Sequence, residues 1–296
     1  VPDPVLQQLE DPTSLDVSVN DAFRPVSRFF DRINRPEQLI PSLLNAMRVL
    51  TDPAETGAVT IAMPQDVQAE VFDWPVELFR KRVWHVRRPV PEPAALERAV
   101  ALIKAAKRPL IIAGGGTIYA GASEELRALA TATGIPVGDT QAGKGAINFD
   151  HPSAVGGVGS TGCDSGNHIA DKADLIIGVG TRYSDFTTAS KTQFKNPDVK
   201  FVNINVTPFD AAKESAEMVV ADAREALAAL REALADYRVE AAYSEEIAAE
   251  KEAWLKATER CYHLDHGPLP AQTEVFGALN ELMGEEDVVI NAAGSM

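Results

Sequence analysis

The feature that most constrains the fold is the stretch Arg108-Pro-Leu-Ile-Ile-Ala-Gly-Gly-Gly116. Its apolar run does not alternate with polar residues, which is typical of a strand buried on both faces of a parallel sheet. The three glycines that follow let the backbone turn sharply or let another group approach it closely. Ser123 is then placed to cap a helix that ends at Gly134. This order of strand, glycine turn, helix and next strand predicts an α/β fold with a doubly wound, Rossmann-like parallel sheet.

The remainder of the chain supplies more short apolar runs and more helical patterns. We predict further strands at 57–63, 135–137, 174–180, 200–205, 218–221 and 288–291. Helices with an apolar face are predicted at 37–50, 93–103, 123–133 and 223–237. A charged, alanine-rich helix is predicted at 239–262 and another helix at 269–283. Residues 1–36 are predicted to be loops with one short helix. Residues 138–167 are predicted to be a long loop without structure of its own, and such loops are usually functional or lie at an interface.

The charge balance and the cysteines limit what this chain can bind and where it works. It carries 28 Lys and Arg against 43 Asp and Glu, a net charge of −15, so we expect no nucleic acid as a partner. No apolar run is long enough to cross a bilayer, so we expect no membrane partner. Cys163 and Cys261 lie far apart in sequence and suggest no disulfide framework. A reducing, cytoplasmic location is therefore expected.

The two ends of the sequence suggest that it is an internal piece of a longer protein. It begins at Val1 without an initiator methionine or a signal-peptide pattern. It stops at Met296, shortly after a predicted strand and a turn of small residues. A processed but complete protein is the weaker alternative.

The glycine turn only partly matches the fingerprint of a dinucleotide site. After Gly114 and Gly116, the third glycine position holds Tyr119. Asp139 follows the next predicted strand at roughly the distance expected of an acid that binds a ribose. Two interpretations stay open, namely a bound nucleotide and close packing of strand against helix without a ligand.

Two other motifs are weaker. The run from Gly138 to Gly145 nearly matches a phosphate-binding P-loop, but Gly145 stands where the loop needs Ser or Thr, and no helix pattern follows. Four residues of types that bind metals lie near one helix end, but their spacing matches no zinc pattern, so a solvated linker is favoured. These four are Cys261, His263, Asp265 and His266.

The remaining candidate residues lie after predicted strands. Cys163 and His168 lie in the glycine-rich loop with no third partner for a nucleophile nearby, and no Gly-x-Ser-x-Gly elbow occurs. Arg182 and Asp185 follow the carboxyl end of a strand, where α/β proteins usually bind ligands. A surface ion pair between them is the favoured alternative, since such pairs are common.

Taken in order, three segments resemble the thiamine-diphosphate-dependent enzymes of the acetolactate-synthase type. Residues 57–67 are similar to the closing strand and the Pro-x-Asp-Val motif of the pyrimidine-binding domain in that family. Residues 107–180 are similar to most of the central domain, and residues 287–294 to the first strand and turn of the diphosphate-binding domain.

The resemblance implies five successive segments. They are the C-terminal part of a pyrimidine-binding domain at 1–75, a linker at 76–92, a central Rossmann-like domain at 93–238, a helical linker at 239–270 and the start of a diphosphate-binding domain at 271–296.

Within this family, residues 33–37, 50–57 and 291–295 are most similar to the branch that opens the ring of trihydroxycyclohexane-1,2-dione in myo-inositol catabolism. The resemblance implies a hydrolase that cleaves a carbon–carbon bond of a small cyclic diketone. It implies thiamine diphosphate and Mg²⁺ as cofactors of the full-length enzyme, which is expected to be a homodimer or homotetramer. FAD is not expected, because these relatives do no redox chemistry.

The resemblance also indicates which residues contact a cofactor. Gly114, Gly115, Gly116 and Arg182 match the region where some relatives bind FAD or an adenine nucleotide. Gly294 and Ser295 match a stretch that approaches the diphosphate. No catalytic residue and no metal ligand is expected here, since the family's activating glutamate lies upstream and its magnesium motif downstream. The chain alone is therefore expected to be inactive.

Two alternatives to the hydrolase remain. One is a carboligase of the acetolactate-synthase type whose central domain binds FAD. The other is a non-catalytic domain that binds a nucleotide or only supports assembly.

Overall fold

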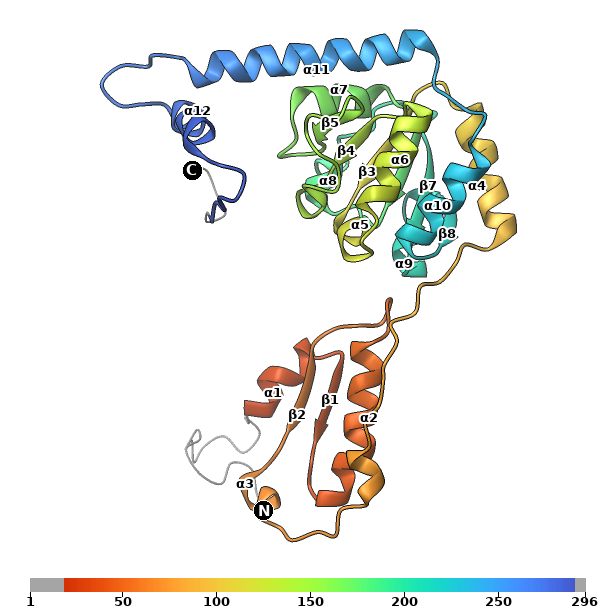
Figure 1. The fold of residues 1–296 in the computed structure, drawn as a ribbon, viewed down its shortest axis with the longest axis vertical. Coiled ribbons are helices and arrows are strands. Elements are labelled where there is room, and N and C mark those ends of the chain that lie inside the picture. The colour runs from red at the N-terminus through yellow and green to blue at the C-terminus, as the bar shows by residue number, and fades with distance from the viewer. Residues whose placement is uncertain (1–18, 291–296) are drawn as a thin grey trace. The chain divides into compact units, whose positions relative to one another are not determined.

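The computed structural model describes residues 19–290, and their contacts divide the chain into two compact units, Val1–Pro89 and Val90–Met296 (Figure 1). Each unit is described by itself. No helix among the described residues has the length and the apolar character that crossing a bilayer requires.

The first unit is a small βαβ arrangement. Strands β1 (Phe29–Arg32) and β2 (Val59–Ala62) pair in parallel, and helix α2 (Leu39–Leu50) connects them. Helix α1 (Val19–Phe23) precedes this pair and the short helix α3 (Gln65–Gln68) follows it. Residues before 37 are predicted to be loops with one short helix, and this prediction is wrong for residues 29–32, which form the strand β1. Its four residues do not alternate, so only the pairing with β2 identifies them as a strand.

The second unit is built on a parallel sheet of six strands in the order β5-β4-β3-β6-β7-β8. The chain starts in the middle of the sheet at β3, proceeds outward to β5, returns to β6 and proceeds to the other edge. This confirms the predicted doubly wound α/β fold. The strands are β3 (Pro109–Ala113), β4 (Val137–Asp139), β5 (Ala154–Gly157), β6 (Leu175–Val179), β7 (Lys200–Asn205) and β8 (Glu217–Val220).

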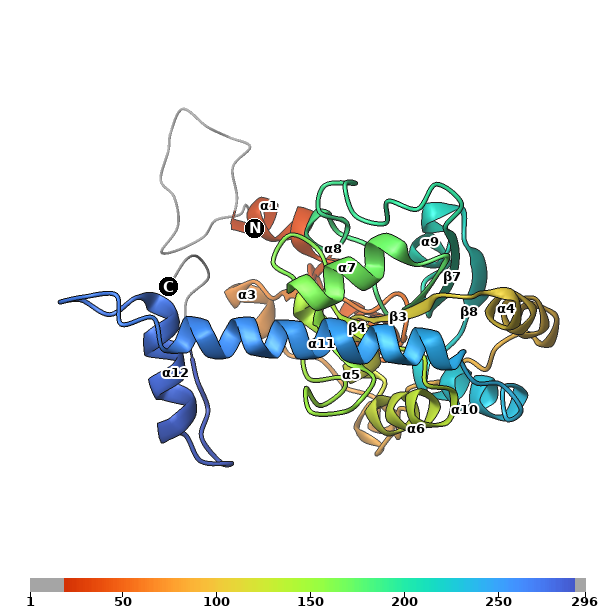
Figure 2. The same cartoon turned by 90° about the horizontal axis from the view of Figure 1, so that it is seen from above.

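Helices cover both faces of this sheet, so β3 and β6 are buried along their whole length. Figure 2 shows α6 and α10 on one side and α7 on the other. The helices before, between and after the strands are α4 (Pro93–Ala105), α5 (Gly115–Tyr119), α6 (Ser123–Thr133), α7 (Asp164–Lys172), α8 (Asp185–Thr188), α9 (Pro208–Ala211) and α10 (Ala223–Ala233).

Two further helices follow the sheet. Helix α11 (Ala241–Tyr262) lies along α7 with Tyr243 and Ile247 buried, and helix α12 (Gln272–Leu282) packs against its far end. A Cβ at Gly277 of α12 would lie 2.7 Å from the Cβ of Tyr262, which is why the two helices can approach so closely there.

Three local predictions are wrong. The loop predicted at 138–167 contains β5 and the start of α7. The strand predicted at 288–291 is absent from residues 288–290, where Ile290 is 93% exposed, because no neighbouring strand is there to pair with it; Asn291 lies outside the described residues. Ser123 is the first residue of α6 rather than its cap, whereas Asp222 caps α10 by accepting from two backbone amides.

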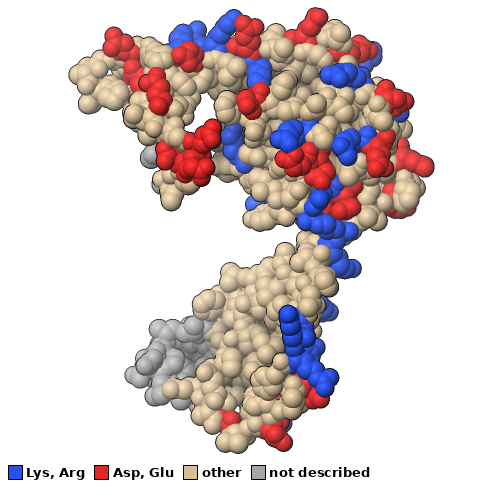
Figure 3. Space-filling view, in the orientation of Figure 1, with Lys and Arg blue, Asp and Glu red and all other residues tan. Residues whose placement is uncertain are grey.

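The surface of the second unit carries charges of both signs. On the face drawn in Figure 3, acidic and basic side chains are interspersed over that unit. Several of them form ion pairs between elements, such as Arg98 of α4 with Glu217 of β8 and Arg224 of α10 with Glu125 of α6.

Candidate functional site

A cavity of about 540 Å³ opens at the carboxyl ends of the strands in the second unit. It lies where the chain order of the sheet reverses, between β3 and β6, which is the position where ligands bind in open α/β sheets. Its volume is within the range of small-molecule sites. The lining comes from the turns after five strands and includes Gly114, Gly115, Gly116, Gln141, Thr161, Arg182, Phe186, Asn205 and Asp210.

Two glycine turns meet at the floor of this cavity. A Cβ at Gly114 would lie 2.3 Å from the carbonyl oxygen of Gly180, and one at Gly116 would lie 2.7 Å from the Gly180 Cα. Gly180 itself has a φ of +59°, a conformation that favours glycine. The turn after β3 and the turn after β6 therefore touch backbone to backbone. This close packing requires glycine at positions 114 and 116, and a role of Gly114, Gly115 and Gly116 in binding a ligand stays a prediction.

Arg182 lies at the same cavity, so the structure brings together four of the residues predicted to contact a cofactor. Its carbonyl oxygen accepts a hydrogen bond from Lys213 Nζ at 2.7 Å, and its side chain is exposed. The same Lys213 Nζ lies 2.6 Å from Asp210 Oδ1. No ion pair joins Arg182 to Asp185 among the described side chains, so the favoured surface pair is wrong.

Hydroxyl side chains form much of the wall, and the sequence did not single them out. They are Thr140, Thr161, Thr181, Ser184 and Thr187. Thr140 Oγ1 accepts from the Gly143 amide at 3.1 Å, and Thr181 Oγ1 accepts from the Tyr183 amide at 3.3 Å. Thr187 is only 4% exposed, but its hydroxyl oxygen is not one of the buried unpaired atoms in the described part of the chain and is accessible from the cavity.

Asp139, predicted as a candidate ribose-binding acid, does not line the cavity. It is 5% exposed, and burial raises the pKa of its carboxyl group above the usual value, while the charge of Lys144 opposes that shift. The Nζ of Lys144 is 3.9 Å from Asp139 Oδ2. Lys144 is followed by turns rather than by a helix, as the argument against a P-loop expected.

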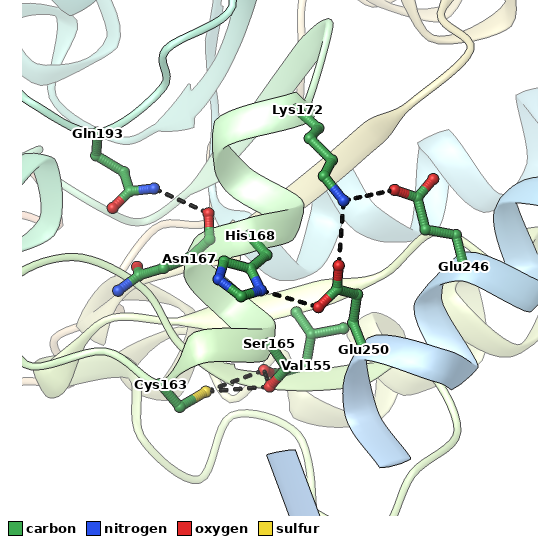
Figure 4. Close-up of polar contacts among 9 residues, drawn as sticks. All are labelled: Val155, Cys163, Ser165, Asn167, His168, Lys172, Gln193, Glu246 and Glu250. Carbon is green, nitrogen blue, oxygen red and sulfur yellow. Dashed lines mark hydrogen bonds and ion pairs between the residues drawn. The ribbon is translucent and has the colours of Figure 1, made fainter. Parts of the chain in front are cut away.

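Cys163 and His168 face different partners and form no nucleophile and base pair (Figure 4). Cys163 Sγ donates to the carbonyl oxygen of Val155 at 3.2 Å. His168 Nδ1 lies 2.9 Å from Glu250 Oε2 on α11. Both side chains are thus held by structural contacts.

The described residues offer no metal site. Between residues 19 and 290 no three His, Cys, Asp or Glu side chains gather in a way that could hold a metal ion, so the set around Cys261 forms none. Gly294 and Ser295 lie outside the described residues, and their contact with a diphosphate stays a prediction.

A comparison with protein families identifies the fold that carries this cavity. Residues 96–230 match the family model described as the central domain of thiamine pyrophosphate enzymes. This segment is a central domain of that family, and the resemblance seen in the sequence is confirmed.

Curated relatives extend the similarity over the whole chain. The 3D-(3,5/4)-trihydroxycyclohexane-1,2-dione hydrolase of Bacillus cereus (strain AH820) is 47% identical, and the alignment covers 100% of this chain and 50% of the relative. The hydrolase of the same name from Bacillus anthracis is 46% identical over 100% of this chain and 50% of the relative. The hydrolase of Bacillus thuringiensis (strain Al Hakam) is 48% identical, with 99% and 49% covered. The chain thus spans about half the length of the curated relatives it matches.

Proposed function

We propose that this chain is the central portion of a thiamine-diphosphate-dependent hydrolase that opens the ring of trihydroxycyclohexane-1,2-dione, as in myo-inositol catabolism. One observation carries the proposal. The similarity to hydrolases of that name runs along the entire chain at 47% identity and is not limited to the family's central domain.

The reaction consumes one water molecule. When the bond between the two adjacent carbonyl carbons breaks, one carbon gains the hydroxyl group and becomes a carboxylic acid, and the other gains hydrogen and becomes an aldehyde. Thiamine diphosphate, when bound, would supply a nucleophilic thiazolium carbon and a group that can stabilise negative charge next to the broken bond. We assign no step of this chemistry to the described residues.

The other expectations follow from this reaction. Mg²⁺ would hold the diphosphate, and FAD is not required because hydrolysis transfers no electrons. The unpaired cysteines Cys163 and Cys261 fit a reducing cytoplasm. A homodimer or homotetramer remains our proposal for the full-length enzyme.

The test is to express the full reading frame that contains this chain and to follow the dione and the open-chain acid by chromatography. We expect turnover that needs both thiamine diphosphate and Mg²⁺. Carboligation of pyruvate with no ring opening would contradict the proposal. As a control, the 296-residue chain alone should bind no thiamine diphosphate measurably in calorimetry with Mg²⁺ present, and micromolar binding would argue against the assignment of the machinery to other segments.

A second candidate, a nucleotide-binding module, is favoured by the cavity at the reversal point of the sheet. Thermal unfolding with ADP, FAD or NAD tests it, because a bound ligand raises the apparent stability. A null result with all three would favour a purely structural role.

A further inference from the structure

The cavity between β3 and β6 is lined in part by hydroxyl groups that form no hydrogen bond within residues 19–290. Thr187 is 4% exposed and lines the cavity, and its hydroxyl has no hydrogen-bond partner among the described residues. The Thr187 hydroxyl oxygen is not among the buried unpaired atoms of residues 19–290, so it is accessible from the cavity and can bond to a ligand there. Ser184 and Thr161 lie on the same wall, and their hydroxyls are likewise unpaired within residues 19–290.

The charges of the lining suit one negative group rather than several. Arg182 is the cation among the lining residues, and its guanidinium group is exposed and has no partner in the described chain. The carboxylate of Asp210 is held by Lys213 at 2.6 Å. A ligand with two phosphates would meet one guanidinium and would also approach the Asp210 carboxylate. A single carboxylate matches the fork of one arginine.

The acid that the sequence placed to bind a ribose is not part of this wall. Asp139, the acid placed by sequence to bind a ribose, is buried away from the cavity beside Lys144. What the wall does offer is hydroxyls, together with the side-chain amide of Gln141. Such groups donate and accept hydrogen bonds and therefore suit a ligand with several hydroxyls of its own.

We propose that this cavity binds a small polyhydroxylated monocarboxylate, with the carboxylate on Arg182 and hydroxyl groups on Thr187 and Ser184. The volume of about 540 Å³ leaves room for bridging waters beside such a ligand. This class of ligand includes the open-chain acid of the proposed reaction. Only that link to a product rests on the proposed function; the binding site itself does not.

Calorimetry with the 296-residue chain tests the proposal, with gluconate as the probe. We expect saturable binding of gluconate, and at least tenfold weaker binding of propionate, which has the charge but no hydroxyls, and of myo-inositol, which has the hydroxyls but no charge. Equal affinity for gluconate and propionate would overturn the proposal, as would binding of ADP or FAD with none of gluconate.

Three variants locate the site. Arg182→Gln should weaken gluconate binding about tenfold or more, and Thr187→Val about threefold or more, since hydrogen bonds to charged groups exceed neutral ones in strength. Arg127→Gln is the matched control, because Arg127 is exposed on α6, pairs with Glu124 and does not line the cavity. Ser184→Ala, at the partly exposed rim, replaces Thr187→Val if that variant does not fold. Unchanged affinity in Arg182→Gln would overturn the proposal. Because binding is measured directly, it is independent of whether the full-length protein opens the dione.

Discussion

At the scale of single residues, the floor of the cavity depends on glycines, because a side chain at these positions would push the two turns apart. Gly114 and Gly180 bring two turns together at a distance that no Cβ fits, since one at Gly114 would lie 2.3 Å from the Gly180 oxygen. Gly115 is less constrained, because its Cβ would lie 3.3 Å from Ala142. Neighbouring glycines of one motif therefore differ in how strongly the packing of the two turns requires glycine.

This difference predicts different costs. Gly114→Ala should lower the free energy of unfolding by about 1–3 kcal/mol, the range for overpacked interiors, because the backbone of two turns must move apart. Gly115→Ala, the matched control, should lower the free energy of unfolding by a smaller amount. Urea denaturation of both variants checks this, and equal losses would mean that the turn after β6 adjusts freely.

A buried tyrosine gives a second prediction at this scale. The Tyr183 hydroxyl donates to Asn203 Oδ1 at 2.8 Å. Burial raises the pKa of Tyr183 well above its ordinary value, and Glu214 adds to that effect. A group with a raised pKa contributes stability that is present below its unfolded pKa and is lost as the pH rises above it. The free energy of unfolding should therefore fall above about pH 10, the ordinary pKa of a tyrosine in an unfolded chain.

Tyr183→Phe isolates this contribution. At neutral pH the free energy of unfolding of the variant should be about 1–3 kcal/mol lower than that of the parent protein, because Asn203 Oδ1 then stays buried without a hydrogen-bond donor. Above about pH 10 its stability should fall less steeply than that of the parent protein, so the gap between the two narrows. Chemical denaturation from neutral to strongly alkaline pH measures it, with Tyr119→Phe, at a 93% exposed position, as control. A gap that stays constant with pH would contradict the argument.

The sequence located part of the cavity at residue level and missed the rest. Glycines and an arginine after apolar runs indicate strand ends, and parallel strands bring their carboxyl ends to one edge, so Gly114, Gly115, Gly116 and Arg182 were found. Thr187 was not, because threonine is common throughout the sequence and only the fold reveals which hydroxyl groups line the cavity.

At the scale of elements, α11 is fixed to the sheet domain by a cluster of charges on its first half (Figure 4). Glu246 accepts from Arg108 at 2.7 Å and from Lys172 at 3.1 Å. Glu250 accepts from Lys172 at 3.1 Å and pairs with His168, whose hydrogen bond is the main reason that the pKa of Glu250 lies below its usual value. The cluster joins α11 to α7 and to the residue before β3.

Removing one carboxylate should loosen the helix locally. Glu246→Gln leaves Arg108 and Lys172 without that partner, so we expect faster amide hydrogen exchange in the first half of α11, most clearly at low salt. Glu252→Gln, whose carboxylate pairs along the helix with Lys256, is the control and should change little. Equal exchange in both variants would show that α11 is held by the packing of Tyr243 and Ile247 and by the hydrogen bond from the Tyr243 hydroxyl to the Pro109 carbonyl oxygen at 3.2 Å.

The elements that the sequence missed share a physical cause. Strand β5 reads Ala-Val-Gly-Gly and β1 reads Phe-Phe-Asp-Arg, and neither has a pattern of its own. Both become strands through their pairing with a neighbour. The converse holds at 288–290, where a clear apolar run remains unpaired. Central strands such as β3 and β6 were predictable because burial on both faces demands continuous apolar sequence.

At the scale of the whole molecule, the two units differ in how much apolar surface they bury. Among described residues, the first unit has Ile33, Pro36 and Ala46 buried, whereas the second has a continuous core on both faces of its sheet. Small units with little core are marginally stable. Stability should thus be concentrated in the second unit.

Limited proteolysis of the native chain checks this. Cleavage should begin within the first unit, and mass spectrometry should find a resistant fragment that starts near Val90 and retains α4 through the first half of α11. Early cuts between β3 and β8 would contradict it.

The two-stranded sheet of the first unit has open edges, which affect how the isolated chain behaves in solution. Its two paired strands each have one side with no neighbouring strand among residues 19–290. On the open side of β1 the Arg32 carbonyl oxygen accepts from Gln38 Nε2 at 2.9 Å, and another strand could pair with backbone groups that no strand covers. Concentrated samples of the isolated chain are therefore prone to polymerise strand by strand into fibrillar material, and light scattering should grow more steeply than in proportion to concentration.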